Sequence, residues 1–262
     1  MKKILAILLV LVLALLIVAC GTDPVESEKE TDPADVQTQI ETDGETDPSD
    51  ETDPVVVDPA AKSEGVMTYA EYAAAELKAE VVIEAYVQAT QSWWDNKITV
   101  YLQDPDGAYF AYEMACSEED AAKLVKGAKI RVTGYKAEWA GEVEITDCSF
   151  ELLEGNWVAE PTDVTALLGT DELIKHQNKL VSFNDMTVEK IEYKNGEPGD
   201  DIYVTVAKDG ASYSFCVERY LTGPETDLYK AVGELKVGDA VDVTGFLYWY
   251  NGVNTHITAI AK

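Results

Sequence analysis

Apolar and polar positions alternate through the part of the chain after residue 66, and this pattern predicts mainly β-structure. The alternation is clear over residues 81–88 and again over 98–103. A period of two buries one face of a strand and leaves the other in water, as in antiparallel sheets. The four residues Asp104-Pro-Asp-Gly107 separate the second run from a third and predict a hairpin turn. We therefore expect three consecutive strands.

Two short helices are predicted around these strands. Thr68 and Glu71 have the spacing of a capping box, which predicts a helix over residues 68–77. Ser117 precedes three acidic residues, a sequence typical of a helix N-terminus, and this second helix should end before Gly127. Strands are then expected over residues 129–137 and 142–152.

The chain contains an internal repeat. Residues 124–135 match residues 235–246 in a Gly turn, an alternating strand and a Val-Thr-Gly-aromatic ending, and a Trp and then a Gly follow in both copies. The second copy predicts a helix near 163–168, strands near 180–191, 202–208 and 211–217, a helix near 225–232, and strands near 240–247 and 253–261. Three strands, a helix and two strands is the order of the OB-fold, a five-stranded Greek-key barrel. The predicted fold class is all-β with short helices, as two tandem OB-fold-like barrels.

Three segments of the first copy also resemble a known family. Residues 69–88, the hairpin containing Asp106-Gly107, and residues 127–135 are similar to the OB-fold modules of Gram-positive bacterial lipoproteins. The resemblance covers most of 67–153 and, less closely, 179–261. Its motifs are structural and therefore imply a fold more than an activity. Similar modules accompany nuclease or phosphoesterase domains in extracellular proteins, so an accessory subunit of an extracellular hydrolase is one implied alternative.

The first twenty residues resemble the signal peptide of a lipoprotein. Lys2-Lys3 precede fifteen apolar residues, a run too short for a comfortable membrane span, and the run ends in the lipobox-like sequence Leu16-Ile-Val-Ala-Cys20. This predicts cleavage after residue 19, lipidation of Cys20 with chains such as palmitate, and extracytoplasmic anchoring to the bacterial cell membrane. An ordinary signal peptide or an uncleaved anchor are the alternatives.

A long acidic segment follows the lipobox. Residues 20–65 hold fifteen acidic residues and two lysines, and the tripeptide Thr-Asp-Pro occurs four times. Without aromatic residues or apolar periodicity the segment is predicted to be a disordered linker. Calcium binding and threonine glycosylation are alternative uses of its side chains. The predicted domains are thus the signal peptide (1–19), the linker (20–65), a first OB-like domain (66–155) and a second (156–262).

Aromatic side chains supply the candidate ligand site. OB barrels bind ligands on the outer face of strands two and three and on the loops between strands one and two and between strands four and five. Aromatic side chains there can stack on sugar rings or bases. The candidate binding residues at these places are Trp93, Trp94, Tyr101, Trp139, Tyr248, Trp249 and Tyr250. The alternative for such residues is packing, and Trp157 is expected to pack between the domains.

Charge and composition limit the function classes. The net charge is −29, and the region after residue 65 is itself acidic, which disfavours general affinity for nucleic acid. No catalytic motif is present, and His176 and His256 are the only histidines, so we predict no enzyme, no cofactor and no metal. Cys116 and Cys148 are expected to be buried apolar residues, with a disulfide between them left open. The predicted function is non-catalytic binding of a cell-wall glycan or a surface protein, with nucleic acid as the alternative.

Overall fold

The computed structural model describes residues 58–262, which belong to one compact unit. The predicted signal peptide, Cys20 and most of the acidic linker lie outside the described residues. No helix within residues 58–262 is both long enough and apolar enough to cross a membrane. The predicted domain boundaries stay predictions.

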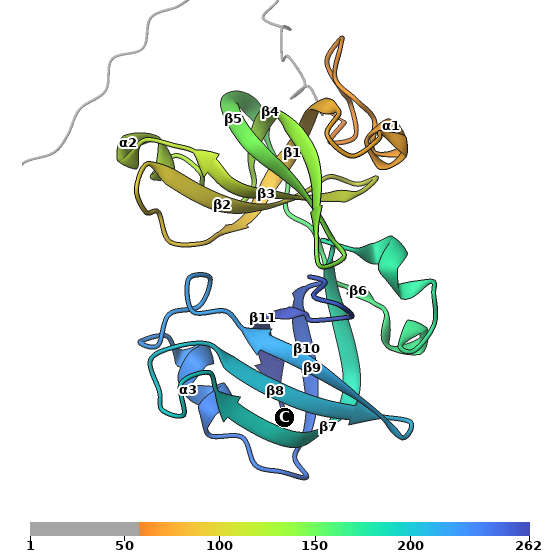
Figure 1. Ribbon diagram of the computed structural model, residues 1–262, viewed down its shortest axis with the longest axis vertical. Coiled ribbons are helices and arrows are strands. Elements are labelled where there is room, and N and C mark those ends of the chain that lie inside the picture. The colour runs from red at the N-terminus through yellow and green to blue at the C-terminus, as the bar shows by residue number, and fades with distance from the viewer. Residues whose placement is uncertain (1–57) are drawn as a thin grey trace, which may run out of the picture. The chain divides into compact units, whose positions relative to one another are not determined.

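The first half of the described chain forms a closed five-stranded barrel (Figure 1). Its strands are paired in the order β1-β2-β3-β5-β4, and β4 pairs with β1 to complete the circle. Helix α1 precedes the barrel, and the short helix α2 connects its third and fourth strands. The bounds are α1 Tyr69–Ala74, β1 Glu80–Thr90, β2 Lys97–Gln103, β3 Ala108–Ala115, α2 Glu118–Ala121, β4 Ala128–Trp139 and β5 Glu142–Asn156.

The second half repeats the same strand order. Its strands are paired as β7-β8-β9-β11-β10, and β10 also pairs with β7, so this sheet closes as well. The bounds are β6 Thr162–Asp163, η1 Thr165–Leu167, η2 Leu173–His176, β7 Leu180–Tyr193, β8 Ile202–Lys208, β9 Ala211–Val217, α3 Asp227–Gly233, β10 Ala240–Phe246 and β11 His256–Ala261. The fold class predicted from the repeat, two tandem OB-like barrels, is confirmed.

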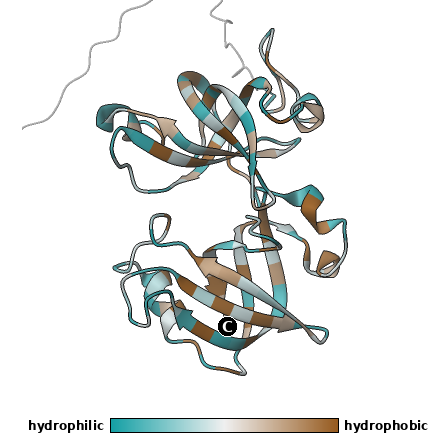
Figure 2. Ribbon diagram, in the orientation of Figure 1, coloured by the Kyte–Doolittle hydropathy of each residue, from teal (hydrophilic) through white to brown (hydrophobic). Residues whose placement is uncertain are grey.

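Each barrel has its own core, built from the alternation that the sequence shows. Figure 2 shows apolar and polar bands following one another along the strands. The first core includes Ile83, Val100 and Ile130, and the second includes Phe183, Val204 and Phe215, all fully buried. Burial of such side chains stabilises a fold by about 1.5–3 kcal/mol each, so each barrel carries its own stabilising core.

Several local predictions are confirmed by the side chains. Thr68 and Glu71 form the predicted capping box, and Ser117 Oγ accepts a hydrogen bond from Asp120 N (3.1 Å). The first helix ends at Ala74, three residues earlier than predicted, whereas the second ends before Gly127 as predicted. At the hairpin turn, Asp104 Oδ1 accepts hydrogen bonds from the backbone N of Asp106 and Gly107 (2.7 and 2.8 Å), which fixes the turn by the usual Asx geometry.

One predicted helix of the second half is wrong, and the last strand starts three residues later than predicted. The expected helix near 163–168 is instead the two-residue strand β6 followed by a short 3-10 turn, because Asp163 Oδ1 accepts hydrogen bonds from Thr165 N and Thr165 Oγ1 (2.9 and 2.6 Å). This local bonding competes with helical bonding. The last strand begins at His256 and not at residue 253, because residues 249–253 form a turn closed by a bridge between Trp249 and Val253.

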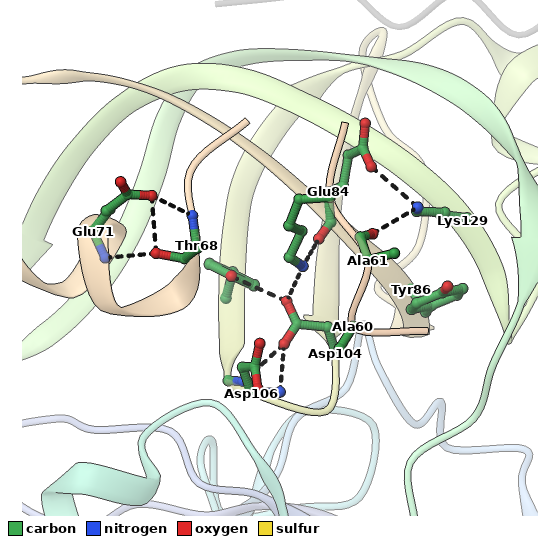
Figure 3. A network of polar contacts seen from close by, with 12 residues as sticks. Ala60, Ala61, Thr68, Glu71, Glu84, Tyr86, Asp104, Asp106 and Lys129 are labelled. Carbon is green, nitrogen blue, oxygen red and sulfur yellow. Dashed lines mark hydrogen bonds and ion pairs between the residues drawn. The ribbon is translucent and has the colours of Figure 1, made fainter. Parts of the chain in front are cut away.

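A buried ion network joins the segment before α1 to the first barrel (Figure 3). Glu84 of β1 is fully buried and pairs with Lys129 (3.1 Å) and Arg131 (2.9 Å) of β4. Lys62 lies in the preceding segment, and its Nζ pairs with Asp104 Oδ2 (2.6 Å) and donates to the backbone O of Glu84 (2.7 Å). Although burial acts to raise it, the pKa of Glu84 is held at about 2 by the hydrogen bonds from Ser63, Lys129 and Arg131.

The three cysteines in the described residues are free and buried. Cys116 and Cys148 both belong to the core of the first barrel, as expected for small apolar side chains. Burial raises the pKa of the Cys148 thiol to about 12, so this group is an inert thiol at neutral pH.

Candidate functional site

The two barrels contact each other through a small apolar cluster and a set of backbone hydrogen bonds, which together we call the join. Its buried apolar residues are Tyr101, Phe110, Ala159, Leu180 and Phe246, with Trp157 partly buried against them. The rings of Tyr101 and Phe246 are stacked with centroids 4.4 Å apart. Trp157 therefore packs between the barrels as predicted.

Polar side chains in the join bond to the other barrel's backbone. Gln103 Oε1 accepts from Leu180 N (2.8 Å), and Asn178 Nδ2 donates to Val143 O (3.1 Å). Glu142 Oε2 accepts from Trp249 N (2.8 Å). Because these groups are buried and would be costly to leave unpaired, they fix one barrel against the other more specifically than the apolar contacts alone.

A cleft with a volume of about 830 Å³ lies beside the join, and it is referred to below as the cleft. Its volume is in the range of small-molecule binding sites. The lining includes Thr99 and Tyr112 on the β2–β3 face of the first barrel and Tyr203 and Ser214 on the β8–β9 face of the second. Strands β8 and β9 correspond to β2 and β3 in the repeated order. The faces that OB barrels use for ligands therefore meet at one shared cleft in this protein.

The aromatic side chains of the cleft come from both barrels and from the loops beside these faces. Trp139 and Tyr250 are exposed and their rings lie 5.1 Å apart, although they are 111 residues apart in sequence. Trp94 is 71% exposed. The aromatic lining residues are Trp94, Phe110, Tyr112, Trp139, Tyr203, Tyr220, Tyr248 and Tyr250.

The structure places four of the seven candidate binding residues along the cleft: Trp94, Trp139, Tyr248 and Tyr250. The other three lie elsewhere. Trp93 packs against the first core, and its Nε1 donates to Cys116 O (2.8 Å). Tyr101 is on the outer face of β2 as expected but is covered by Phe246 of the second barrel. Trp249 packs against the second core.

Sequence reasoning missed Tyr112, Tyr203 and Tyr220. The first two lie on outward-facing positions of β3 and β8, so the alternation that predicted the strands already contained a signal for them. Tyr220 lies in the loop after β9, where no periodic pattern exists. Its backbone O accepts a hydrogen bond from Ser92 N (2.7 Å) of the first barrel, a contact that only the tertiary structure reveals.

The charges along the cleft are mostly neutralised by pairing. Lys97 Nζ lies 2.7 Å from Glu113 Oε2, and Lys194 Nζ lies 2.9 Å from Asp201 Oδ2. Glu218 is the remaining acidic lining residue, and burial raises its pKa. Both lysines that line the cleft are thus ion-paired, so within the described residues the lining offers no unpaired lysine for a phosphate.

Among residues 58–262 no three His, Cys, Asp or Glu side chains are grouped so as to hold a metal ion. His176 lies on η2 and is absent from the cleft lining, whereas His256 begins β11 and lines it.

The fold assignment of this chain depends on its strand pairing and not on similarity to known proteins. No family model and no curated protein matches the chain. Among solved structures, a murine DNA-binding protein bound to double-stranded DNA has 12% identity and a TM-score of 0.35, covering 69% of this chain and 97% of that one. The Ifi202 HINa domain in complex with 20 bp double-stranded DNA has 9% identity and a TM-score of 0.33, covering 70% and 98%. A replication protein A heterotrimer bound to single-stranded DNA has 13% identity and a TM-score of 0.29, covering 70% and 50%.

Proposed function

We propose that this protein is a non-catalytic binding protein, held outside the bacterial cell membrane by a lipid on Cys20, and that its cleft binds an uncharged glycan. The observation that carries the ligand assignment is the cleft itself, where exposed aromatic rings from two barrels face a lining whose lysines are already paired. Aromatic rings offer flat apolar surfaces to sugar rings, and hydroxyl and amide side chains among them offer hydrogen bonds.

The lack of unpaired lysines in the described lining supports an uncharged ligand over nucleic acid. Nucleic acid binding gains most of its affinity from cationic side chains that replace the counterions of phosphates. Lys97 and Lys194 would first have to leave carboxylates 2.7 and 2.9 Å away. An uncharged glycan requires no such exchange.

Single-stranded nucleic acid is the second candidate. The observation that favours it is the exposed Trp94 close to Lys97, because bases stack on aromatic side chains with little regard to sequence. Such binding would weaken steeply as salt is raised, whereas binding of an uncharged glycan would not.

Titration of the full chain at two salt concentrations tests the proposal. Trp fluorescence is followed while soluble cell-wall glycan fragments or single-stranded DNA are added. We expect saturable, salt-insensitive binding of a glycan that is lost in Trp94→Ala combined with Trp139→Ala. The matched control is Trp157→Phe, which changes a Trp outside the cleft. Binding of DNA alone, with a steep salt dependence, would replace the glycan by the second candidate.

The lipid anchor has its own test. Cys20→Ala is expected to move the protein from the membrane fraction to the soluble fraction and to abolish incorporation of a labelled fatty acid. Cys148→Ala is the matched control and should retain both properties. Membrane retention of the Cys20→Ala protein would contradict the lipid anchor while leaving the cleft assignment intact.

A further inference from the structure

His256 is a nearly buried residue of the cleft lining. Its side chain comes from the first residue of β11, and the residue is only 6% exposed yet lines the cleft. Tyr248 covers one face of the imidazole, with ring centroids 4.2 Å apart. Of its two ring nitrogens, Nδ1 lies 2.6 Å from Tyr101 OH, and Nε2 has no hydrogen-bond partner among residues 58–262.

A chain of hydrogen bonds connects Gln91, Tyr101 and His256. Gln91 Nε2 donates to Tyr101 OH (3.1 Å), and Tyr101 OH lies 2.6 Å from His256 Nδ1, a hydrogen bond whose direction depends on the tautomer of the imidazole. Burial keeps the pKa of His256 at about 3, so the ring is neutral near pH 7 and carries one proton. In the tautomer with that proton on Nε2, Nδ1 accepts from the tyrosine hydroxyl and Nε2–H is an uncharged donor for a ligand in the cleft.

Asn254 lies two residues before His256 and also lines the cleft. Its Oδ1 is buried without a hydrogen-bond partner in the described part of the chain. A buried polar atom left unpaired costs about 1–3 kcal/mol in general, so a ligand that pairs this amide gains from a site that is already prepared.

We propose that His256 and Asn254 recognise the acetamido group of an N-acetylated sugar. The carbonyl of such a group accepts from His256 Nε2–H, its N–H donates to the oxygen of Asn254, and its methyl group contacts the aromatic rings of Tyr248 and Phe110, whose centroids lie 5.4 Å apart. The Nε2–H group of His256 can only donate, and the carbonyl oxygen of an acetamido group can only accept, so the two are complementary. This inference rests on the proposed function and names the ligand class of the same cleft.

Two tetrasaccharides that differ only in the substituent at C2 of each sugar test it. The full chain is titrated by calorimetry with β-1,4-linked N-acetylglucosamine tetramer and with β-1,4-linked glucose tetramer, which has a hydroxyl group in place of each acetamido group. We expect about tenfold tighter binding of the acetylated sugar. Equal affinities, or a preference for glucose, would overturn the inference and leave the proposed function standing. Binding of neither sugar, nor of any other glycan, would overturn both.

Substitutions of His256 then test whether its imidazole produces the preference for the acetylated sugar. In His256→Phe the affinity ratio of the two sugars should fall to about one, whereas His176→Phe, the matched histidine outside the cleft, should keep the wild-type ratio. Should His256→Phe fail to fold, His256→Gln, which keeps an amide N–H, should retain part of the preference. An unchanged ratio in a folded His256 variant would overturn the assignment of the donor.

Tyr101 is a positioning residue in this arrangement, because it acts through His256. Tyr101→Phe removes the hydroxyl that holds Nδ1 as an acceptor, so the imidazole should become a mixture of tautomers and the sugar preference should fall several-fold. Nitrogen-15 NMR of the histidine ring reads the tautomer directly, and a purely structural role of Tyr101 would not change it. A single Nε2–H tautomer in Tyr101→Phe would contradict the hydrogen-bond chain.

Discussion

The two barrels share one strand order but use their polar residues differently. In the repeated Val-Thr-Gly strand, Arg131 of the first barrel corresponds to Asp242 of the second. Arg131 pairs with the fully buried Glu84. Asp242 is exposed and accepts a hydrogen bond from the backbone N of Asp185 (2.8 Å). The first barrel thus has an internal ion network at the position where the second has a solvated carboxylate.

The two barrels place their buried polar groups in different parts of the molecule. The network of the first barrel fixes the segment that leads into it, where Lys62 is bonded to β1 and to the hairpin. The second barrel concentrates its buried polar groups, including Gln177, Asn178 and His256, at the join and the cleft. The shared strand order is compatible with both, because neither set occupies the barrel interior.

The largest expected effect comes from breaking the network. Glu84→Ala leaves two cationic side chains beside an emptied buried position, which should destabilise the protein by roughly 3–5 kcal/mol. Asp242→Ala, at the paired strand position of the other barrel, should cost less than about 1 kcal/mol. Chemical denaturation of the full chain measures both. Similar losses in the two variants would remove the contrast between the barrels.

Substitutions of Trp93 and Trp94 compare a residue of the first core with a residue of the cleft. Trp93→Ala removes a side chain packed in the first core and should cost roughly 3 kcal/mol with the cleft left intact. Trp94→Ala changes an exposed side chain and should alter the free energy of unfolding by less than about 0.5 kcal/mol while weakening glycan binding. Denaturation and sugar titration of both variants provide the check, and a reversed pattern would show that their roles are exchanged.

The two buried glutamates predict opposite responses to pH. The pKa of Glu84 is lowered to about 2, so its stabilising contribution is present above pH 4.5 and is lost as the pH falls through 2. Burial raises the pKa of Glu142 to about 8, so its contribution is full below pH 4.5 and is lost as the pH rises through 8.

Glu142→Gln isolates the second of these effects. Between pH 5 and pH 8 the wild-type free energy of unfolding should fall by roughly 3 kcal/mol more than that of the variant. Denaturation at both pH values measures the difference, with Glu154→Gln, at an exposed position of the same strand, as the control. Parallel losses in wild type and Glu142→Gln would mean that Glu142 does not titrate in this range.

The smallest effect is expected for the ion pairs of the cleft. Lys97 and Glu113 are both more than 40% exposed, so Lys97→Ala should change the free energy of unfolding by less than about 0.5 kcal/mol. Its glycan affinity should be unchanged at low and high salt. A large, salt-dependent loss of affinity for a nucleic acid in this variant would instead favour the second candidate function.

The alternation of apolar residues predicted the strands of the first barrel, because burial on one face of a strand is a local property of the sequence, and the internal repeat extended the prediction to the second barrel. The capping residues Thr68 and Ser117 were predictable for the same reason. The join was only partly predictable: Trp157 was expected there, but no local pattern indicates that Tyr101 of one barrel lies against Phe246 of the other. Likewise, Trp93 and Trp94 are adjacent and chemically identical, and only the tertiary structure separates the core residue from the cleft residue.

The closure of the second barrel takes place beside the cleft. Strands β9 and β11 are in register at a single residue pair, Cys216 and His256, and both residues line the cleft. A sugar bound against His256 would therefore also stabilise the pairing of β9 with β11 that closes the barrel. The amide of Cys216, which donates to Thr255 O (2.9 Å), should then exchange its hydrogen for deuterium more slowly in the presence of glycan. The exchange rate of this one backbone amide would therefore report whether the cleft is occupied.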